Sequence, residues 1–113
     1  TNGTNDNEQL LVAGELRIDP QKRRVIIEGE TLDLTAKEFD LLYQLASSPG
    51  RVFSRSDLLD KVWGYNFNGY EHTVNSHINR LRGKIEPNLQ TPTYILTTWG
   101  VGYRFNEELV AVS

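Results

Sequence analysis

Residues 68–87 read NGYEHTVNSHINRLRGKIEP. Apolar side chains recur within this stretch at intervals of four, three and four residues, at Val74, Ile78, Leu81 and Ile85. This spacing places one narrow apolar seam along one side of a helix. Asn68 to Glu71 offer a cap at its start, and Pro87 prevents it from continuing. We therefore expect a helix from about residue 70 to about residue 86 whose seam packs on the rest of the molecule.

The opposite side of this helix carries groups that suit DNA. At 100° per residue it holds His72, Thr73, Ser76, Arg80 and Gly83, with His77, Asn79 and Lys84 on its flanks. Short polar side chains and Arg hydrogen-bond base edges, and Arg, Lys and His bind phosphates. Gly83 has no side chain, so nothing projects from the helix at this point and a DNA backbone can approach it closely. An ordinary solvated helix surface is the alternative at this point.

The net charge of the chain is −3 at pH 7, which by itself argues against a nucleic-acid partner. The charge is unevenly distributed, however. Residues 1–50 carry five basic and nine acidic groups, whereas residues 51–86 carry six basic and four acidic groups. Arg80, Arg82 and Lys84 form a short basic run with no acid among them. The overall charge therefore does not exclude one DNA-binding face.

The first third of the chain predicts a linker and a small sheet. Residues 1–9 are polar and rich in Gly and Asn, which is typical of a flexible linker. Residues 10–34 combine alternating and β-branched runs with turn signals, which predicts an antiparallel meander of three or four strands. Because so small a sheet is not stable alone, we expect it to pack against the helices that follow.

Two helices are expected between this sheet and the helix quoted first. Thr35 and Glu38 fit a capping box, and apolar residues follow them at helical spacing. Pro49 and Gly50 end this helix. Ser54 caps a second helix, which Gly64 ends. Three successive helices therefore follow the predicted sheet.

The C-terminal part predicts a β-hairpin. Residues 94–97 and 103–105 read as strands, and a Gly-bearing loop joins them. Strands, three helices and a hairpin make an α+β domain, and three helices followed by a hairpin is the order of a winged helix. The third helix is then the candidate reader of the DNA major groove, and the hairpin is the wing. We place this domain at residues 10–106 and a C-terminal tail at residues 107–113.

Composition and motifs exclude several other classes. The chain has no cysteine, and its two histidines have no metal-ligand spacing. No apolar run approaches the roughly 18 to 20 residues needed to span a bilayer. No Gly-rich phosphate loop follows a strand, so we expect neither an enzyme nor a cofactor site. The alternative to a DNA-binding module is a winged-helix domain that mainly binds protein.

Five segments resemble a known family. They are Leu34-Thr35-x-x-Glu38-Phe39-x-Leu41-Leu42, Pro49-Gly50-Arg51-Val52-Phe53-Ser54-Arg55, Val62-Trp63-Gly64, Thr73-Val74-x-x-His77-Ile78-x-Arg80-Leu81-Arg82-x-Lys84-Ile85 and Gly100-Val101-Gly102-Tyr103-Arg104-Phe105. In this order and spacing they are similar to the C-terminal DNA-binding effector domains of OmpR/PhoB-type response regulators. The resemblance covers about residues 10–106. It implies a winged helix-turn-helix with a four-stranded N-terminal sheet, in a bacterial, cytoplasmic transcription factor of a two-component phosphorelay.

The resemblance also implies DNA contacts in three places. They fall on Thr73, His77, Arg80 and Arg82 of the third helix, on Thr97 and Tyr103 of the wing, and on Trp63. Trp63 and His77 also fit a second interpretation, as residues that pack against the core. Arg82 lies close to the apolar seam, so it must extend outward to reach DNA.

Three positions depart from the family's pattern. His72 stands where the family often has Arg, Asn75 where it often has Asp, and Trp99 where the wing tip is usually basic. Two cationic contacts common in the family are therefore absent here or depend on the charge of His72, whereas the expected fold is unchanged. Two placements of Trp99 remain open: against a sugar–phosphate edge of DNA, or folded back beside Tyr103.

Further partners are implied by the resemblance alone. The isolated domain is expected to be monomeric and to pair on direct repeats of double-stranded DNA. The aromatic loop at residues 64–70 corresponds to a segment that touches RNA polymerase in this family, unless its aromatics plug the core. A phospho-accepting receiver domain is expected upstream of Thr1.

Overall fold

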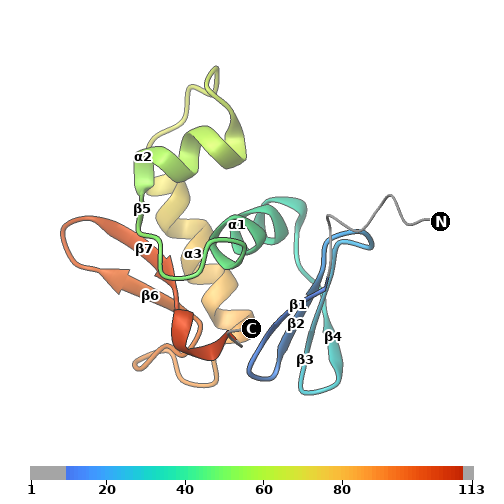
Figure 1. The fold of residues 1–113 in the computed structure, drawn as a ribbon. Coiled ribbons are helices and arrows are strands. Elements are labelled where there is room, and N and C mark those ends of the chain that lie inside the picture. Colours follow the sequence, from blue (N-terminus) through green and yellow to red (C-terminus); the bar gives the residue numbers. More distant parts are fainter. Residues whose placement is uncertain (1–9, 111–113) are drawn as a thin grey trace.

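The computed structural model describes residues 10–110, which begin with a four-stranded antiparallel sheet (Figure 1). Its strands, in chain order and in spatial order, are β1 (Leu11–Ala13), β2 (Leu16–Asp19), β3 (Arg24–Ile27) and β4 (Glu30–Leu32). Leu16, Ile18 and Val25 are buried on one face of the sheet. Gly14 has a φ of 59° in the turn between β1 and β2, which glycine adopts without strain. The predicted N-terminal four-stranded sheet is confirmed.

Helical segments follow this sheet. They are α1 (Ala36–Ala46), α2 (Arg55–Leu58), the π-helical turn η2 (Leu59–Trp63) and α3 (His72–Ile85). α1 begins with the predicted capping box, in which the amide of Glu38 donates to Thr35 Oγ1 and the amide of Thr35 donates to Glu38 Oε1. α2 begins with a second capping box on Ser54. Gly64, at a φ of 102°, follows η2 as the sequence predicts.

The start of α3 differs from the prediction. The helix begins at His72, and the expected cap by Asn68 is wrong. The residue at the cap position is Glu71, whose backbone is already helical at φ −60° and ψ −26°, and no side chain caps it. A side-chain cap needs an extended backbone at that residue, so none forms. The amides of Thr73 and Val74 bond instead to the carbonyl oxygens of Tyr70 and Glu71.

The wing contains three strands. β6 (Ile95–Thr98) and β7 (Gly102–Phe105) form the predicted hairpin, and β5 (Phe53–Ser54) pairs with the other edge of β7. The sequence marked residues 52–53 only as a short apolar segment, so this strand was missed. A side chain at position 102 would overlap the Phe53 carbonyl oxygen, so the close pairing requires Gly102. β5 thereby ties the wing to the start of α2.

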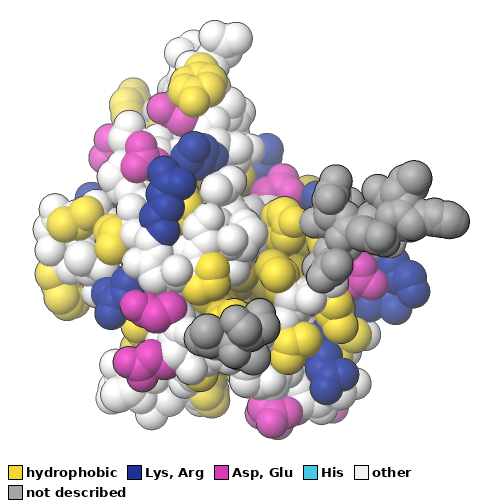
Figure 2. Space-filling view, viewed as in Figure 1, with side chains coloured by type: hydrophobic (Ala, Val, Ile, Leu, Met, Phe, Trp, Pro, Cys, Tyr) yellow, Lys and Arg dark blue, Asp and Glu magenta, His cyan; other side chains and the backbone are white. Residues whose placement is uncertain are grey.

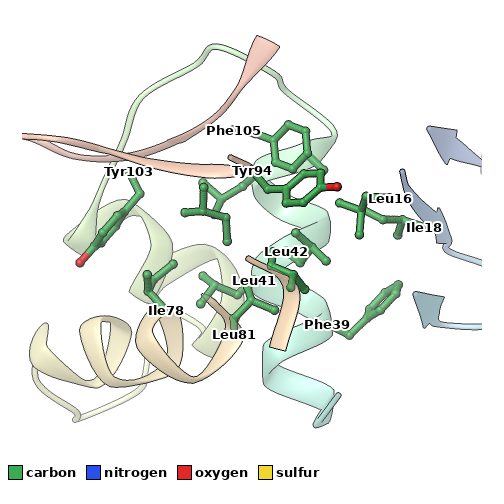
Figure 3. Close-up of a cluster of buried hydrophobic side chains, with 14 of the residues drawn as sticks. Leu16, Ile18, Phe39, Leu41, Leu42, Ile78, Leu81, Tyr94, Tyr103 and Phe105 are labelled. Atoms are coloured by element: carbon green, nitrogen blue, oxygen red, sulfur yellow. The ribbon is translucent and has the colours of Figure 1, made fainter. Parts of the chain in front are cut away.

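α1 and α3 lie between the two sheets, α2 lies above them at the top of the view, and the main core fills the middle layer (Figure 1). Figure 3 shows Leu16 of β2 facing α1 from one side and Phe105 of β7 reaching in from the other. Ile78 and Leu81 of the predicted α3 seam are fully buried, as is Leu42 of α1. Each such side chain stabilises the fold by about 1.5–3 kcal/mol. The core therefore fixes which side of α3 faces outward.

The C-terminal boundary lies later than predicted. Residues Glu107–Leu109 form a short 3₁₀ turn (η3), and Val110 pairs with Ala13 in an isolated bridge. Leu109 and Val110 also pack against the core, so these residues belong to the domain rather than to a tail. A three-residue turn leaves no periodic signal in the sequence. The predicted linker at residues 1–9 and residues 111–113 lie outside the described residues.

Candidate nucleic-acid interface

The outward side of α3 presents the predicted polar groups. His72, Asn79, Arg80 and Gly83 are exposed, and Ser76 is half-buried. The side chains of Asn79 and Arg80 form no hydrogen bond or ion pair with any residue in the range 10–110. A Cβ added at Gly83 would meet only open space, so this side is low, as expected. A donor–acceptor amide and a guanidinium are therefore available on one open helix surface.

The first turn of α3 is also accessible. The ring of His72 stacks on that of Tyr70, with 5.6 Å between centroids and 13° between ring planes. Ser76 Oγ donates to the His72 carbonyl oxygen at 3.2 Å, so this hydroxyl is engaged locally. Tyr70 is 73% exposed. The stacked pair forms a polar and aromatic edge beside Thr73, at the end of α3 opposite Lys84.

Trp63 and His77 pack against each other on one flank of α3. Their rings meet edge to face, with 4.9 Å between centroids, and both residues are half-buried. His77 Nδ1 lies 2.8 Å from the carbonyl oxygen of Thr73. Because a carbonyl oxygen only accepts, Nδ1 carries the proton and Nε2 is left for another partner. The Lys37 ammonium lies 5.8 Å from the Trp63 ring centroid, within cation–π range.

Arg82 binds the wing instead of extending outward. Its Nε and Nη2 donate to the Ile95 carbonyl oxygen at 3.2 and 2.8 Å, and Nη2 also donates to Thr97 Oγ1 at 2.8 Å. The guanidinium carbon lies 5.4 Å from the ring centroid of Tyr103. Burial lowers the pKa of Arg82 below its usual value, although the group stays charged. In this structure Arg82 joins α3 to β6.

Lys84 also has an intramolecular partner. Its Nζ donates to Glu38 Oε1 at 2.6 Å and to the Asp33 carbonyl oxygen at 2.9 Å. Burial alone would raise the pKa of Glu38, but hydrogen bonds from Lys84 and from the Thr35 amide, with the Lys84 charge, lower it below its ordinary value. The DNA contact of Lys84 stays a prediction, and in this structure its ammonium neutralises a buried carboxylate.

Asn75 is a residue whose role sequence reasoning missed. Its Oδ1 accepts from Arg55 Nε of α2 at 2.9 Å and from the Tyr103 hydroxyl of β7 at 2.8 Å. Tyr103 is only 8% exposed, so its hydroxyl points into this junction rather than into open solvent. The sequence offered one signal, the family's frequent Asp at this position. It gave no indication of either hydrogen-bond partner.

The wing tip projects away from the domain. Trp99 is 89% exposed and Val101 is 53% exposed, so Trp99 does not fold back beside Tyr103. Figure 2 shows hydrophobic side chains gathered at the outer end of the wing, at the left of the view, and at the tip of the loop before α3, at the top. A hollow of about 450 Å³ separates the wing from the α3–β6 loop and is lined by Arg82, Leu89 and Trp99, among others. The outward placement leaves an indole free for a partner.

Two other kinds of site are not found among residues 10–110. No three His, Asp or Glu side chains in this range gather closely enough to hold a metal ion. No helix in the same range is long and apolar enough to cross a membrane.

The sequence matches the family model described as "Transcriptional regulatory protein, C terminal" over residues 29–105, and solved structures of response regulators share its fold. The chain belongs to this family of OmpR/PhoB-type effector domains. It is 45% identical over 103 residues to the transcriptional regulatory protein YclJ of Bacillus subtilis, covering 90% of this chain and 44% of YclJ. It is 43% identical over 102 residues to the DNA-binding response regulator MtrA of Mycolicibacterium paratuberculosis, covering 88% of this chain and 45% of MtrA.

Two solved structures define the likeness in three dimensions. The effector domain matches the response regulator DrrB of Thermotoga maritima, described as an OmpR/PhoB homolog, with a TM-score of 0.81 and 37% identity over 86% of this chain and 44% of DrrB. It matches the Klebsiella pneumoniae RstA DNA-binding domain in complex with the RstA box with a TM-score of 0.79 and 34% identity over 88% of this chain and 98% of that one. The chain spans about half the length of the curated relatives it matches.

Within the effector domain, the structure divides the predicted contact residues into two groups. The exposed or half-buried group with open access comprises His72, Thr73, Ser76, Asn79, Arg80 and Trp99. The group engaged in contacts within the protein comprises Trp63, His77, Arg82, Lys84, Thr97 and Tyr103. The first group lies along α3 from its first residue, His72, to Arg80, and at the wing tip. The second group holds α3 to its neighbours.

Proposed function

We propose that this effector domain binds a specific sequence of double-stranded DNA and thereby regulates transcription in a bacterial two-component system. α3 enters the major groove with its outward side, and the wing lies along the neighbouring minor groove. The observation that carries the proposal is the open surface formed by Asn79 and Arg80, whose side chains have no partner within residues 10–110. The likeness to the RstA domain in complex with its DNA box supports it.

Each open residue except Ser76, whose hydroxyl bonds within α3, has a role in this proposal. Arg80 donates to a guanine edge or a phosphate, and Asn79 presents an amide that can pair with adenine. Thr73 and His72, in the first turn of α3, face the backbone of the groove. Trp99 lies against a sugar–phosphate edge, where its N–H donates to an oxygen and its ring packs on the sugar.

The engaged residues act mainly by holding these groups in place. Thr97 and Tyr103 anchor the wing through Arg82 and Asn75, and we propose that their remaining exposed edges approach the DNA backbone. Trp63 and His77 support one flank of α3, and in the doubly protonated imidazolium form the Nε2–H of His77 donates to a phosphate. Because Lys84 is engaged with Glu38, we assign it no DNA contact.

Partners beyond DNA follow from the same proposal. In the loop before α3, Tyr65 is 82% exposed and Phe67 is 41% exposed, so these aromatics do not plug the core. That exposure supports a contact between this loop and RNA polymerase. A receiver domain on the N-terminal side controls the activity, and two effector domains pair on direct repeats while the isolated domain is monomeric. Binding to chromosomal DNA places the protein in the cytoplasm.

Binding-site selection from a random duplex library tests the central proposal. One sequence should be enriched, and its affinity should fall linearly on a log–log plot as salt is raised, with a slope of about 0.9 per phosphate contact. A scrambled duplex of the same length is the control and should bind much more weakly. If no sequence is enriched, or if binding is insensitive to salt, the DNA-binding proposal fails and the protein-binding alternative replaces it.

A further inference from the structure

Three elements of the proposed DNA-binding surface meet at one amide oxygen. Asn75 lies on the flank of α3 that faces the wing, and its Oδ1 accepts one hydrogen bond from α2 and one from β7. The donors are Arg55 Nε at 2.9 Å and the Tyr103 hydroxyl at 2.8 Å. An amide oxygen has two lone pairs, so these two donors use its full capacity. Oδ1 thus joins the helix that reads DNA to both of its neighbours.

Several polar groups link α3 to the wing within the described residues. Glu86, which caps the end of α3, accepts from the amides of Tyr94 and Ile95 at the base of the wing. Arg82 holds the edge strand β6 through Ile95 and Thr97, and Asn75 holds the central strand β7 through Tyr103. Links to both strands fix the direction of the hairpin relative to α3. The Tyr103 link attaches one residue after Gly102, at the end of β7 nearest the exposed tip. The angle of the tip therefore depends on Asn75 more than on Arg82.

The pairing of β5 with Gly102 and Tyr103 also holds β7 here, but it attaches β7 to the start of α2 rather than to α3. Tyr103 is 8% exposed, but Asn75 is only half-buried and Arg55 is exposed. Apolar contacts hold the base of the wing, where Ile95 and Phe105 are fully buried. Toward the tip the exposed side chains of Trp99 and Val101 provide no such anchor. The hydrogen bonds of Asn75 are thus placed where apolar packing ends.

We propose that Asn75 is a positioning residue for DNA recognition, which sets the angle of the wing so that α3 and the wing engage adjacent grooves together. Asn75 does this through Tyr103 and Arg55, without itself reading a base. This inference rests on the proposed DNA binding. In this proposal the Tyr103 hydroxyl bonds to Asn75 and does not contact DNA. It affects DNA binding by setting the position of the wing.

Two chemical footprints on the selected duplex separate positioning from mere stability. Dimethyl sulfate reports protection of guanine N7 in the major groove, where α3 lies, and hydroxyl radicals report protection of the sugars beside the wing. Asn75→Leu removes the shared acceptor at similar volume. At saturating protein we expect it to keep the N7 protection and to lose the protection of the sugars beside the wing. Its preference for the selected site over a scrambled duplex should fall about tenfold.

Two further variants complete the experiment. Tyr103→Phe removes only one hydroxyl and should give the same footprint. The double variant Asn75→Leu/Tyr103→Phe should be no worse than Asn75→Leu alone, because both changes break the same Asn75–Tyr103 hydrogen bond. Asn106→Leu is the matched control: it also removes an amide that makes two hydrogen bonds, to Thr93 and Glu108, at the far end of the wing. It should keep both protections.

The outcomes distinguish this inference from the proposed function. Full protection of the sugars by Asn75→Leu, or parallel loss of both protections at saturating protein, overturns the positioning role. Loss of wing protection in Tyr103→Phe but not in Asn75→Leu also overturns it, because the hydroxyl would then contact DNA directly. A wild-type chain that enriches no sequence instead refutes the proposed DNA binding on which the inference rests.

Discussion

Lys84→Met removes the ammonium that neutralises a buried carboxylate. Glu38 is 1% exposed, and its Oε1 receives one hydrogen bond from Lys84 at 2.6 Å and one from the Thr35 amide at 3.0 Å. Breaking a buried ion pair by removing one partner costs about 3–5 kcal/mol. The Lys84 side chain is 37% exposed and the Thr35 amide remains, so we expect the lower value of about 2–3 kcal/mol. For a domain of this size the melting temperature should fall by roughly 10–15 °C.

The loss should depend on pH in a defined direction. In the wild-type protein the pKa of Glu38 is lowered from 4.5, so ionised Glu38 contributes stability above that value and loses it as the pH falls through the lowered pKa. In Lys84→Met the burial of Glu38 is no longer opposed by the ammonium, so the pKa rises. The ionised carboxylate then costs stability at pH 7, and this cost disappears when Glu38 is protonated. The difference between the two proteins should therefore shrink between pH 7 and about pH 4.

Urea denaturation of both proteins at the two pH values measures this difference. Glu38→Gln/Lys84→Met is the matched control, because Gln keeps the capping box with Thr35 while carrying no charge. It should regain most of the stability that Lys84→Met loses at pH 7. Folded Lys84→Met should keep the wild-type salt dependence of DNA binding. A stability difference that is the same at both pH values, or a salt slope that falls by about one, would refute the assignment of Lys84 to Glu38.

Three further changes test the surface and the wing. Arg80→Ala should weaken specific binding by about 1–3 kcal/mol in a titration of the selected duplex, with an unchanged melting temperature because its side chain has no partner within residues 10–110. Trp99→Arg should raise affinity and steepen the salt dependence by about one phosphate contact, without loss of stability, since the indole is 89% exposed; a lower melting temperature would show that the indole packs. Gly102→Ala should cost about 3 kcal/mol in a denaturant titration, because the added methyl group forces β5 away from β7; a wild-type value would contradict that pairing.

Local patterns in the sequence predicted local structure well. The capping box of Thr35 and Glu38 is complete within four residues, so it could be recognised without knowledge of the fold. The apolar residues of the α3 seam repeat with the period of the helix, so they could be predicted to share one face. The structure buries all four of them. β5 was missed for the opposite reason. Its two residues carry no periodicity, and their partners, Tyr103 and Gly102, come about 50 residues later in the chain.

The flanks of α3 show most clearly what the sequence alone does not determine. Helical periodicity placed Arg82 close to the apolar seam and Lys84 on a flank, but it did not say what either side chain would meet. The residues they contact lie 13 and 46 positions away, and they come close only when the wing and α1 pack on α3. Two of the three cations in the basic run therefore serve the fold, and Arg80 alone among the three is free of partners within residues 10–110.

This division of α3 has a physical consequence for recognition. A helix that reads DNA must be held in one orientation. A rotation of a few degrees about its axis displaces the ends of long side chains by more than hydrogen-bond geometry tolerates. The buried apolar seam fixes which side of the helix faces the core. Directional hydrogen bonds on the two flanks limit the small axial rotations that remain. Lys84 bonds on one flank, while Asn75 and Arg82 bond on the other, so rotation in either direction stretches at least one of these contacts. In the proposed function, Arg82 and Lys84 therefore hold α3 in the orientation that directs Arg80 and Asn79 toward DNA.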